Sequence, residues 1–419
     1  MASDLLKGLR MLDLADEKGA LCGKILADMG VEVIKVEPPE GCSTRRIPPF
    51  LDDLPGLCRS TYFLAYAAGK KSVTLNLEKA AGRDLLLDLA RHADFLAESF
   101  PQGYLDSLGL GYDTLAELNP RLIYTTVTPF GDTGPGRGFK AADIVSWASG
   151  GPMFLMGEPG RPPLEMSQPQ AGLHAGGEAA VASMIAHYAR GNDGLGQRIV
   201  VDMQACAVWT MMNEQAMPLL HGDYLRRSGI FTGAIGGRRK TIFKCADGHI
   251  SFLLAGGAYL PSTNAIIAWM KEEGAAPEWL MREGGLKSLT PSGFMTAKTG
   301  DFDELAAAEE AVEQFFIPKT KKEIWENILK RRMLAAPINT VADIAADPQL
   351  KERGYFAEIE YRELGRTLTL PGSFAKLSET PLGPAGPAPQ LGEHNHEIYG
   401  GLLGRSTEEL VRLRAAGAI

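Results

Sequence analysis

The stretch LRMLDLADEKGALCGKILADMGVEVIKVEPP, residues 9–39, decides the fold class. Residues 9–14 form a short apolar run, which predicts a buried strand. Apolar residues at helical spacing predict a helix over residues 19–29, and a glycine ends it. The β-branched segment 31–36 alternates with period two and stops at a pair of prolines, as a strand does. A strand, a helix and a second strand in this order predict an α/β protein with a parallel sheet.

Further segments of the same kind follow. The sequence predicts strands over residues 71–77, 94–98, 122–127 and 198–203. A helix is predicted between the first two of these strands, over residues 79–92. Strands that alternate with helices at this spacing predict a doubly wound, Rossmann-like sheet.

The length of 419 residues predicts more than one domain. Long helices are predicted over residues 171–189 and 205–220, and the sequence becomes rich in Gly, Arg and Lys soon afterwards. We therefore predict the N-terminal part of a large domain over residues 1–225 and a smaller domain over 226–335. The rest of the chain, 336–419, contains a predicted strand pair and a proline-rich stretch, followed again by helical sequence.

Composition narrows the class of protein. Hydrophobic residues make up 45% and charged residues 22%, and the net charge is −8. An acidic protein of this kind is not expected to bind nucleic acid as its main partner. The five cysteines are scattered, with no metal-ligand spacing, and no segment predicts a signal peptide or a membrane span. We expect a cytoplasmic protein with reduced thiols and without a metal.

Several segments, in order along most of the chain, resemble the class III CoA-transferases, the family of formyl-CoA transferase, carnitine CoA-transferase and α-methylacyl-CoA racemase. They are LKGLRMLDLADEKGALCGKILADMGVEVIKVEPPEG, AAGKKSVTLNLEKAAGRDLLLDLARHADFLAESF with its continuation to GDTGPGRG, RIVVDMQACAV, APINTVADIAADPQLKERGYF and PQLGEHNHEIYGGLLGRSTEELVRLRAAGAI. The resemblance implies an interlocked ring dimer. It also implies that residues 336–419 return to the large domain, which is then built from both chain ends around a smaller middle domain.

In this family an aspartate attacks the acyl-CoA thioester, and covalent intermediates then pass CoA from a donor acid to an acceptor acid. CoA thioesters are thus substrates, and no other cofactor is implied. The matching segment here is Pro162 to His174, and Gln168 occupies the aspartate position. A glutamine amide carries no negative charge and cannot form an anhydride. The nearby Glu165 is a surrogate nucleophile, or else an ordinary solvated loop acid.

The racemase branch of the family pairs a histidine with the aspartate as acid and base. Ala142 occupies the histidine position, so the sequence predicts no racemase activity.

The resemblance also implies CoA-binding positions, and several of them depart from the family pattern. Pro38, Ala68 and Ser99 stand where family members often have an arginine, an arginine and an asparagine. The expected CoA-binding residues that remain are Lys70, Lys71, Phe100 and Lys140. Exposed loop lysines and a core phenylalanine would look the same in the sequence.

Two other clusters attract attention. Arg238, Arg239 and Lys240 follow two glycines and could cradle a phosphate, although such runs are more often solvated. His394 and His396 near the C-terminus are interpreted as structural or surface residues.

Three functions remain open. In the first, the chain is the non-nucleophilic subunit of a heteromeric CoA-transferase, paired with a homologous subunit that supplies the aspartate. It would then resemble the two-subunit enzymes of aromatic degradation that activate benzylsuccinate with succinyl-CoA. In the second, it is a homodimeric transferase that uses a displaced carboxylate. In the third, it is a non-enzymatic acyl-CoA-binding or scaffold protein.

Overall fold

The computed structural model describes residues 3–212, 219, 225–232, 239–281, 286 and 301–419. The chain forms two compact units. The first comprises Met1–Pro152, Met166–Met212 and Pro348–Ile419, and the second comprises Met153–Glu165 and Asn213–Asp347. Both chain ends therefore belong to one unit.

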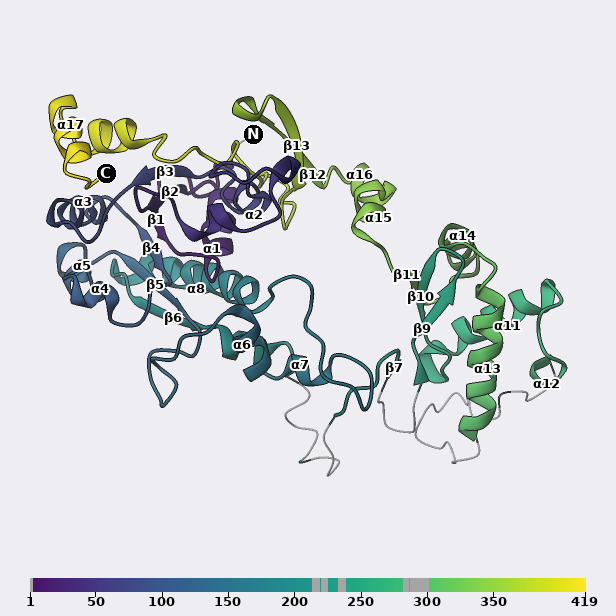
Figure 1. The fold of residues 1–419 in the computed structure, drawn as a ribbon. Helices are drawn as coiled ribbons and strands as arrows, with labels where there is room; N and C mark the ends of the chain where they lie inside the picture. Colours follow the sequence, from purple (N-terminus) through teal and green to yellow (C-terminus); the bar gives the residue numbers. More distant parts are fainter. Residues whose placement is uncertain (1–2, 213–218, 220–224, 233–238, 282–285, 287–300) are drawn as a thin grey trace. The chain divides into compact units, whose positions relative to one another are not determined.

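The first unit is built around a six-stranded parallel sheet with the order β3-β2-β1-β4-β5-β6 (Figure 1). The strands are β1 (Arg10–Leu14), β2 (Glu32–Glu37), β3 (Lys71–Thr74), β4 (Phe95–Glu98), β5 (Ile123–Thr128) and β6 (Arg198–Asp202). This is the order of a Rossmann-like sheet, in which ligands bind beyond the carboxyl ends of the strands. The predicted Rossmann-like fold is confirmed.

Helices cover both faces of this sheet. Those of the first unit are α1 (Ala20–Asp28), α2 (Thr61–Tyr66), α3 (Ala80–Ala90), α4 (Tyr104–Ser107), α5 (Tyr112–Leu118), α6 (Asp143–Ser149), α8 (Ala171–Asp193), α9 (Met203–Trp209), α16 (Pro348–Glu352) and α17 (Thr407–Ala415), and α7 (Pro152–Leu155) lies at the boundary of the two units. Phe95 and Thr125 face α8, whereas their neighbours Leu96 and Tyr124 join a core with α3 and α5. Because successive strand residues point to opposite faces, α8 and α3 lie on opposite sides of the sheet.

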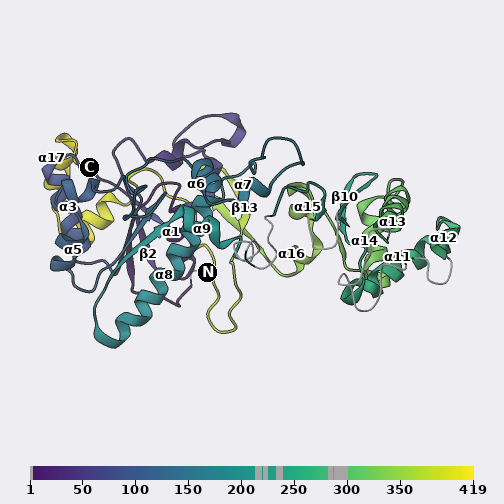
Figure 2. The same ribbon diagram turned by 90° about the horizontal axis from the view of Figure 1, so that it is seen from below.

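Helices α1 and α8 lie side by side and pack closely (Figures 1 and 2). A Cβ atom at Gly176 would lie 2.9 Å from the Cβ of Leu21, so only glycine permits this approach. On the inner side of α1, a Cβ at Gly23 would lie 2.6 Å from a carboxylate oxygen of Asp13. The two glycines thus bring α1 onto its neighbours.

The C-terminal part of the first unit is fastened to the N-terminal part by polar contacts. It contains the hairpin of β12 (Phe356–Tyr361) and β13 (Arg366–Pro371). Asn395 accepts a hydrogen bond from the Thr74 backbone N–H at 2.9 Å and donates one to the Thr74 hydroxyl at 2.7 Å. The backbone N–H of His394 donates to the Ser72 carbonyl, and its ring accepts from the Ser72 N–H. His394 therefore has a structural role beside β3.

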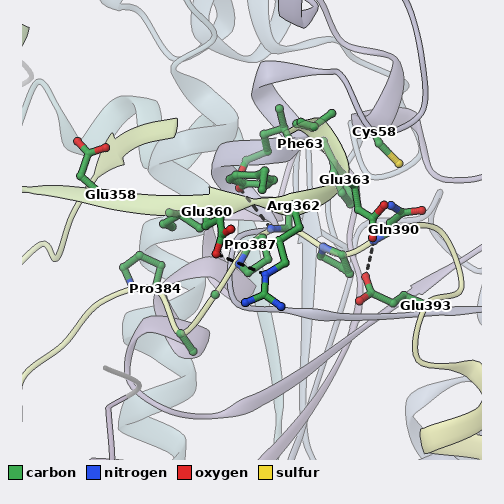
Figure 3. A pocket seen from close by; sticks show the side chains of 18 residues that line it. Cys58, Phe63, Glu358, Glu360, Arg362, Glu363, Pro384, Pro387, Gln390 and Glu393 are labelled. Atoms are coloured by element: carbon green, nitrogen blue, oxygen red, sulfur yellow. Dashed lines mark hydrogen bonds and ion pairs between the residues drawn. The ribbon is translucent and has the colours of Figure 1, made fainter. Parts of the chain in front are cut away.

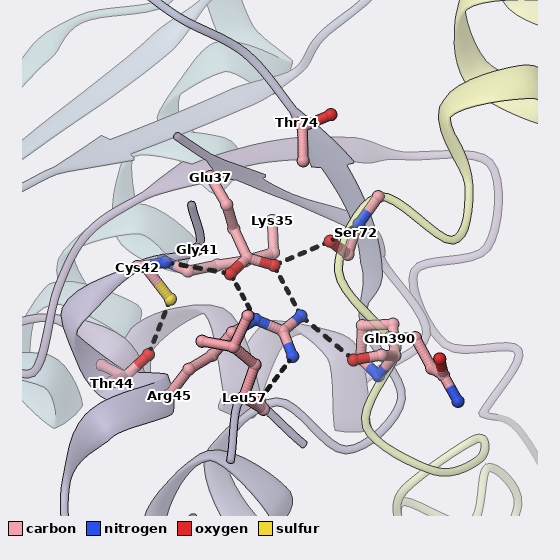
Figure 4. A network of polar contacts seen from close by, with 12 residues as sticks. Lys35, Glu37, Gly41, Cys42, Thr44, Arg45, Leu57, Ser72, Thr74 and Gln390 are labelled. Atoms are coloured by element: carbon pink, nitrogen blue, oxygen red, sulfur yellow. Dashed lines mark hydrogen bonds and ion pairs between the residues drawn. The ribbon is translucent and has the colours of Figure 1, made fainter. Parts of the chain in front are cut away.

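A buried ion pair also connects the C-terminal part of the first unit to the N-terminal part (Figure 4). The guanidinium of Arg45, in the 3₁₀ helix η1 (Ser43–Arg46), donates to both carboxylate oxygens of Glu37 at 2.6 and 2.8 Å. It also donates to the carbonyls of Leu57 and Pro389, and the Ser72 hydroxyl donates to Glu37. Burial alone would raise the pKa of Glu37, but the hydrogen bonds and charge of Arg45 lower it.

The described part of the second unit contains a three-stranded sheet, β11-β10-β9. Its strands and helices are β7 (Phe231–Thr232), β8 (Arg239–Lys240), β9 (Ile242–Cys245), β10 (Gly248–Phe252), α11 (Leu260–Glu272), α12 (Glu278–Met281), α13 (Asp301–Phe316), α14 (Lys321–Arg331), β11 (Ala335–Pro337) and α15 (Val341–Ala346). Phe243, Phe252, Trp269 and Phe316 form an aromatic core between the sheet and the helices.

Candidate active site

The loop that follows β1 carries Asp16, Glu17 and Lys18 at the carboxyl edge of the sheet. Asp16 accepts hydrogen bonds from the Ser99 hydroxyl at 2.7 Å and from the Lys18 backbone N–H at 3.0 Å, and it pairs with the Lys18 ammonium. Ser99 is buried and directly follows β4. Asp16 therefore ties two neighbouring loops together and holds the lysine side chain.

Lys18 lines a cavity of about 480 Å³, which we call the Gln168 cavity. The residues of its wall that matter here are Glu17, Lys18, Tyr62, Tyr66, Asp143 and Gln168. The rings of Tyr62 and Tyr66 have centroids 4.4 Å apart and supply an aromatic surface. Ala142 also lines the cavity, so both positions that the sequence analysis compared with catalytic residues lie around one space.

The N-terminus of α8 is fixed against this cavity by Asp143. Its two carboxylate oxygens accept hydrogen bonds from the backbone N–H groups of Gly172 at 2.7 Å and Gln170 at 2.9 Å. These groups have no partner within the helix, and a negative charge is favourable beside them. A Cβ at Gly172 would lie 3.0 Å from the Glu17 carbonyl, so glycine lets α8 approach the loop that carries Lys18.

We expect Asp143→Ala to destabilise the first unit by about 1–2 kcal/mol, because it removes both partners of these N–H groups. Asp143→Asn keeps one carbonyl acceptor and should lose less. Urea unfolding measures the stability, and hydrogen exchange should show faster exchange at residues 170–173. Unchanged exchange in Asp143→Ala would contradict the role given to this carboxylate.

A second cavity, of about 380 Å³, adjoins the first and is called the Phe100 cavity. Both walls include Lys18 and Ala141. Phe100, Arg137 and Lys140 also line the Phe100 cavity, and Asp16 does so as well. Three cationic groups against one carboxylate suit a polyanionic ligand. The two cavities together can accept a molecule with an anionic part and a compact organic part.

Comparison with known proteins identifies the family of the chain. The model of CoA-transferase family III matches residues 6–395. The chain belongs to CoA-transferase family III. It is 32% identical over 391 residues to the succinyl-CoA:(R)-benzylsuccinate CoA-transferase subunit BbsE of Thauera aromatica, covering 93% of this chain and 92% of that protein. It is also 32% identical to the formyl-CoA:oxalate CoA-transferase of Streptomyces avermitilis, covering 99% of each chain.

A solved structure shares the fold of this family III chain. It is that of a CAIB/BAIF family protein from Brucella suis, with a TM-score of 0.81 and 29% identity. The match covers 96% of this chain and all of that one. The resemblance inferred from sequence blocks is therefore confirmed, and the chain belongs to a family of CoA-transferases.

The four expected CoA-binding residues of this family III chain do not lie together. Phe100 and Lys140 line the Phe100 cavity. Lys70 is buried instead, and its ammonium donates to Asp13 at 2.7 Å and to the Ala20 carbonyl at 3.1 Å. Lys35 pairs with the same aspartate at 3.3 Å. The expectation that Lys70 meets a phosphate must be corrected, because its charge is enclosed in the core and already paired.

Lys71 is partly exposed, but its ammonium is engaged by Glu32 at 2.5 Å and Glu397 at 2.6 Å. It too lies outside the wall of the Phe100 cavity. The sequence places both lysines at the start of β3, but it does not indicate how deeply each side chain is buried.

Other predicted residues are placed as follows. Glu165 is exposed and belongs to the second unit, and it does not line the Gln168 cavity. Arg238 lies outside the described residues. Arg239 and Lys240 are buried, and the Lys240 ammonium pairs with Glu313, so these two residues form no solvated phosphate cradle in the structure.

The sequence analysis missed Glu17, Lys18 and Asp143, although a signal existed for two of them. Glu17 and Lys18 stand in the first strand-to-helix turn, where α/β proteins place ligand contacts. Asp143 could not be selected, because its partners lie 27 and 29 residues further along the chain.

A polar cavity of about 520 Å³ continues from the Phe100 cavity, with Pro101, Gln102, Thr128 and Arg137 in both walls. Its wall contains Glu98, the last residue of β4, which is 6% exposed. Glu98 accepts a hydrogen bond from the Phe100 backbone N–H at 2.8 Å. Burial raises the pKa of this carboxyl to about 7. The contact connects a titratable group to the loop that carries Phe100.

A further pocket, of about 530 Å³, lies between β12, α2 and the proline-rich segment (Figure 3). Phe63, Ile359 and Tyr361 line it, and Glu358, Glu360, Glu363 and Glu393 add carboxylates against the one arginine of its wall. The negative charge makes this pocket unsuitable for the phosphates of CoA.

Among the described residues, no group of three or more His, Cys, Asp or Glu side chains could hold a metal ion. Within the same residues, every helix is too short or too polar to cross a bilayer.

Proposed function

We propose that this chain is the non-nucleophilic subunit of a heteromeric class III CoA-transferase. A homologous subunit would carry the aspartate and transfer CoA from an acyl-CoA donor, such as succinyl-CoA, to a carboxylic acid such as an aromatic succinate. The observation that carries the proposal is Gln168 in the wall of the Gln168 cavity. An amide at this place cannot form the covalent acyl intermediate that the family's reaction requires.

Two other charged groups of the cavity, Asp143 and Lys18, support this reading. Asp143 is held by two backbone N–H groups at the start of α8, so its carboxylate serves as a helix cap. Lys18 is a cation and no nucleophile while it is paired with Asp16. The Thauera aromatica relative is a subunit of succinyl-CoA:(R)-benzylsuccinate CoA-transferase, and this similarity supports both the heteromer and the substrates proposed.

Exposed apolar side chains on the first unit support the proposal of a partner chain. Val181, Ile185 and Tyr188 follow one another on α8 at helical spacing and are 56%, 64% and 83% exposed. Trp209 of α9 is 63% exposed. Large apolar side chains in such a stripe are typical of an interface. We propose that a homologous chain covers it, as part of the interlocked ring that the family resemblance implied.

The test compares the chain alone with a co-expressed pair. A homologous chain with aspartate at the position of Gln168 is produced with and without this chain, and CoA transfer from succinyl-CoA to benzylsuccinate is measured. We expect no transfer by this chain alone and transfer by the mixed species of fixed stoichiometry. Full activity of either homodimer, with no mixed species in native mass spectrometry, would contradict the heteromer.

A second candidate function is transfer by this chain itself through a displaced carboxylate. Glu17 favours it, because this residue lines the Gln168 cavity, whereas Glu165 does not. Hydroxylamine added during incubation with succinyl-CoA, followed by mass spectrometry, distinguishes the two functions. A hydroxamate on Glu17 would support the second function, and an unmodified chain supports the first.

A further inference from the structure

The acidic pocket of Figure 3, which we call the Tyr361 pocket, is separate from the Gln168 cavity and the Phe100 cavity. Its wall shares no residue with the wall of either cavity. Phe63 of α2 lines the pocket, whereas Tyr62 and Tyr66 of the same helix line the Gln168 cavity. The two spaces therefore lie on different faces of α2, and the proposed function uses only one of them.

The inner wall of the Tyr361 pocket is apolar. Its buried side chains include those of Phe63, Leu64, Ile359 and Tyr361. The pocket volume of about 530 Å³ lies within the range of about 300–1,000 Å³ that is typical of small-molecule sites. Such a wall favours the hydrocarbon part of a small ligand, because contact with it removes apolar surface from water.

The Tyr361 hydroxyl holds together the segments that surround the pocket. It donates to the Leu64 carbonyl of α2 at 2.8 Å and accepts from the Ala388 N–H of the proline-rich segment at 3.3 Å. The next residue of that segment, Pro389, accepts a hydrogen bond from the buried Arg45. A ligand therefore meets a wall that is already ordered, and its binding does not have to order these segments.

The exposed part of the wall carries an excess of negative charge. Its charged side chains are Glu358, Glu360, Arg362, Glu363 and Glu393. Arg362 pairs with Glu360 at 3.4 Å, so these two charges offset one another. Glu358 accepts from the Thr369 hydroxyl and Glu393 from the Gln390 N–H, which are neutral donors. Within the part of the chain that the structure describes, three carboxylates of this wall thus have no cationic partner.

The buried Arg45 does not cancel this negative charge. Its guanidinium lies 3.8 Å from the centroid of the Phe63 ring, next to the pocket. Its charge is offset by Glu37, which accepts from it at 2.6 and 2.8 Å. The pocket therefore combines an apolar inner wall with a negative outer wall, and charge complementarity favours a cationic ligand with an apolar body.

We propose that the Tyr361 pocket binds a small organic cation, an ammonium group on a compact apolar body. The body lies against Phe63 and Tyr361, and the ammonium lies among the carboxylates of the outer wall. Because the wall contains residues 58–64 as well as residues 358–393, the bound cation joins the N-terminal and C-terminal parts of the first unit and stabilises their contact. The inference is independent of the proposed function, since no residue of this pocket takes part in CoA transfer.

The test is calorimetric titration of the full chain at neutral pH with phenethylamine, an ammonium on a phenylethyl body. As comparison ligands, 2-phenylethanol has the same body without the charge, methylammonium has the charge without the body, and phenylacetate has the opposite charge. We expect phenethylamine to bind about tenfold more tightly than 2-phenylethanol and methylammonium, and phenylacetate to bind most weakly. Phenethylamine should also slow hydrogen exchange at residues 61–67 and 384–390 and raise the midpoint of urea unfolding.

Exposed positions provide variants that keep the fold. Glu360→Gln combined with Glu363→Gln should weaken phenethylamine binding about tenfold and leave the affinity for 2-phenylethanol unchanged. Arg362→Met removes the one cation of the wall and should strengthen phenethylamine binding about threefold. The matched control combines Glu352→Gln with Glu379→Gln, which changes the net charge equally at exposed positions outside the wall. This control should change neither affinity.

Four results would overturn the inference. They are absence of phenethylamine binding by the folded wild-type chain, equal affinity for phenethylamine and 2-phenylethanol, an equal loss in the control pair, and weaker binding in Arg362→Met. Slower exchange in the wall of the Gln168 cavity without any change at residues 384–390 would place the cation at another site, and the assignment to the Tyr361 pocket would then be wrong.

Discussion

Arg45→Met should lower the free energy of unfolding of the first unit by about 3–5 kcal/mol, the usual cost of breaking a buried ion pair on one side. Arg45 is fully buried, and its guanidinium donates to both oxygens of Glu37 and to the Leu57 and Pro389 carbonyls. Without it, Glu37 is left as a buried charge with only weaker partners. The C-terminal segment also loses a contact that joins it to β2. Urea unfolding of the variant and the wild-type chain measures the difference.

Two further variants separate the ion pair from simple loss of volume. Arg45→Lys keeps the positive charge but loses the bidentate hydrogen bonding of the guanidinium. It should lose less stability than Arg45→Met. Adding Glu37→Gln to Arg45→Met removes the unpaired charge and should recover part of the loss.

Arg362 provides the matched control, because it pairs with Glu360 at 3.4 Å with side chains 84% and 65% exposed. Arg362→Met should change stability by less than about 1 kcal/mol. Equal effects at Arg45 and Arg362 would mean that burial of the first pair does not determine its contribution.

The sheet of the first unit could be predicted from local patterns. Residues 31–36 alternate with period two and end at prolines, and β2 spans Glu32–Glu37. The apolar run at 9–14 became β1, Arg10–Leu14, which lies at the centre of the sheet between β2 and β4. Such strands can be predicted from the sequence, because their burial depends on their own side chains and on the prolines and glycines beside them.

The site was less predictable, because it depends on which distant residues meet. Lys18 and Gln168 line one cavity although 150 positions separate them, and α8 reaches the Lys18 loop only because Gly172 has no side chain. The opposite error concerns Lys70, which the sequence analysis selected as a CoA-binding residue although its charge is enclosed in the core. It precedes β3 as a loop lysine would, yet Gly23 lets α1 close over its pairing with Asp13. Neighbours in space, which no local pattern contains, decided the role of both lysines.

The second large effect is a change of stability with pH, and it comes from Glu98 in the wall of the polar cavity. Burial is the largest cause that raises the pKa of the Glu98 carboxyl to about 7, and the charge of Asp106 contributes to this rise. The hydrogen bond from the Phe100 N–H and the charge of Arg198 oppose the rise without cancelling it. Tyr124 of β5 lines the same cavity. In the unfolded chain the carboxyl should titrate near its ordinary value of 4.5.

The sign of the effect follows from linkage. Below pH 4.5 Glu98 is protonated in both states, so it does not favour unfolding. Between pH 4.5 and about 7 the unfolded chain releases this proton and the folded chain keeps it, so stability falls as the pH rises. Above pH 7 both states are ionised, and the loss has reached its full size of about 3 kcal/mol.

Glu98→Gln removes this titration while keeping a carbonyl oxygen for the Phe100 N–H. The difference in unfolding free energy between the variant and the wild-type chain isolates Glu98 from every other group that titrates in both proteins. We expect this difference to shift by about 3 kcal/mol in favour of the variant between pH 4.5 and pH 8. Infrared difference spectra should show a protonated carboxyl at pH 6 in the wild-type chain and none at this position in the variant. A constant stability difference across this range would mean that Glu98 titrates near its ordinary value in the folded chain too. The polar cavity would then have to stabilise a carboxylate that burial alone disfavours.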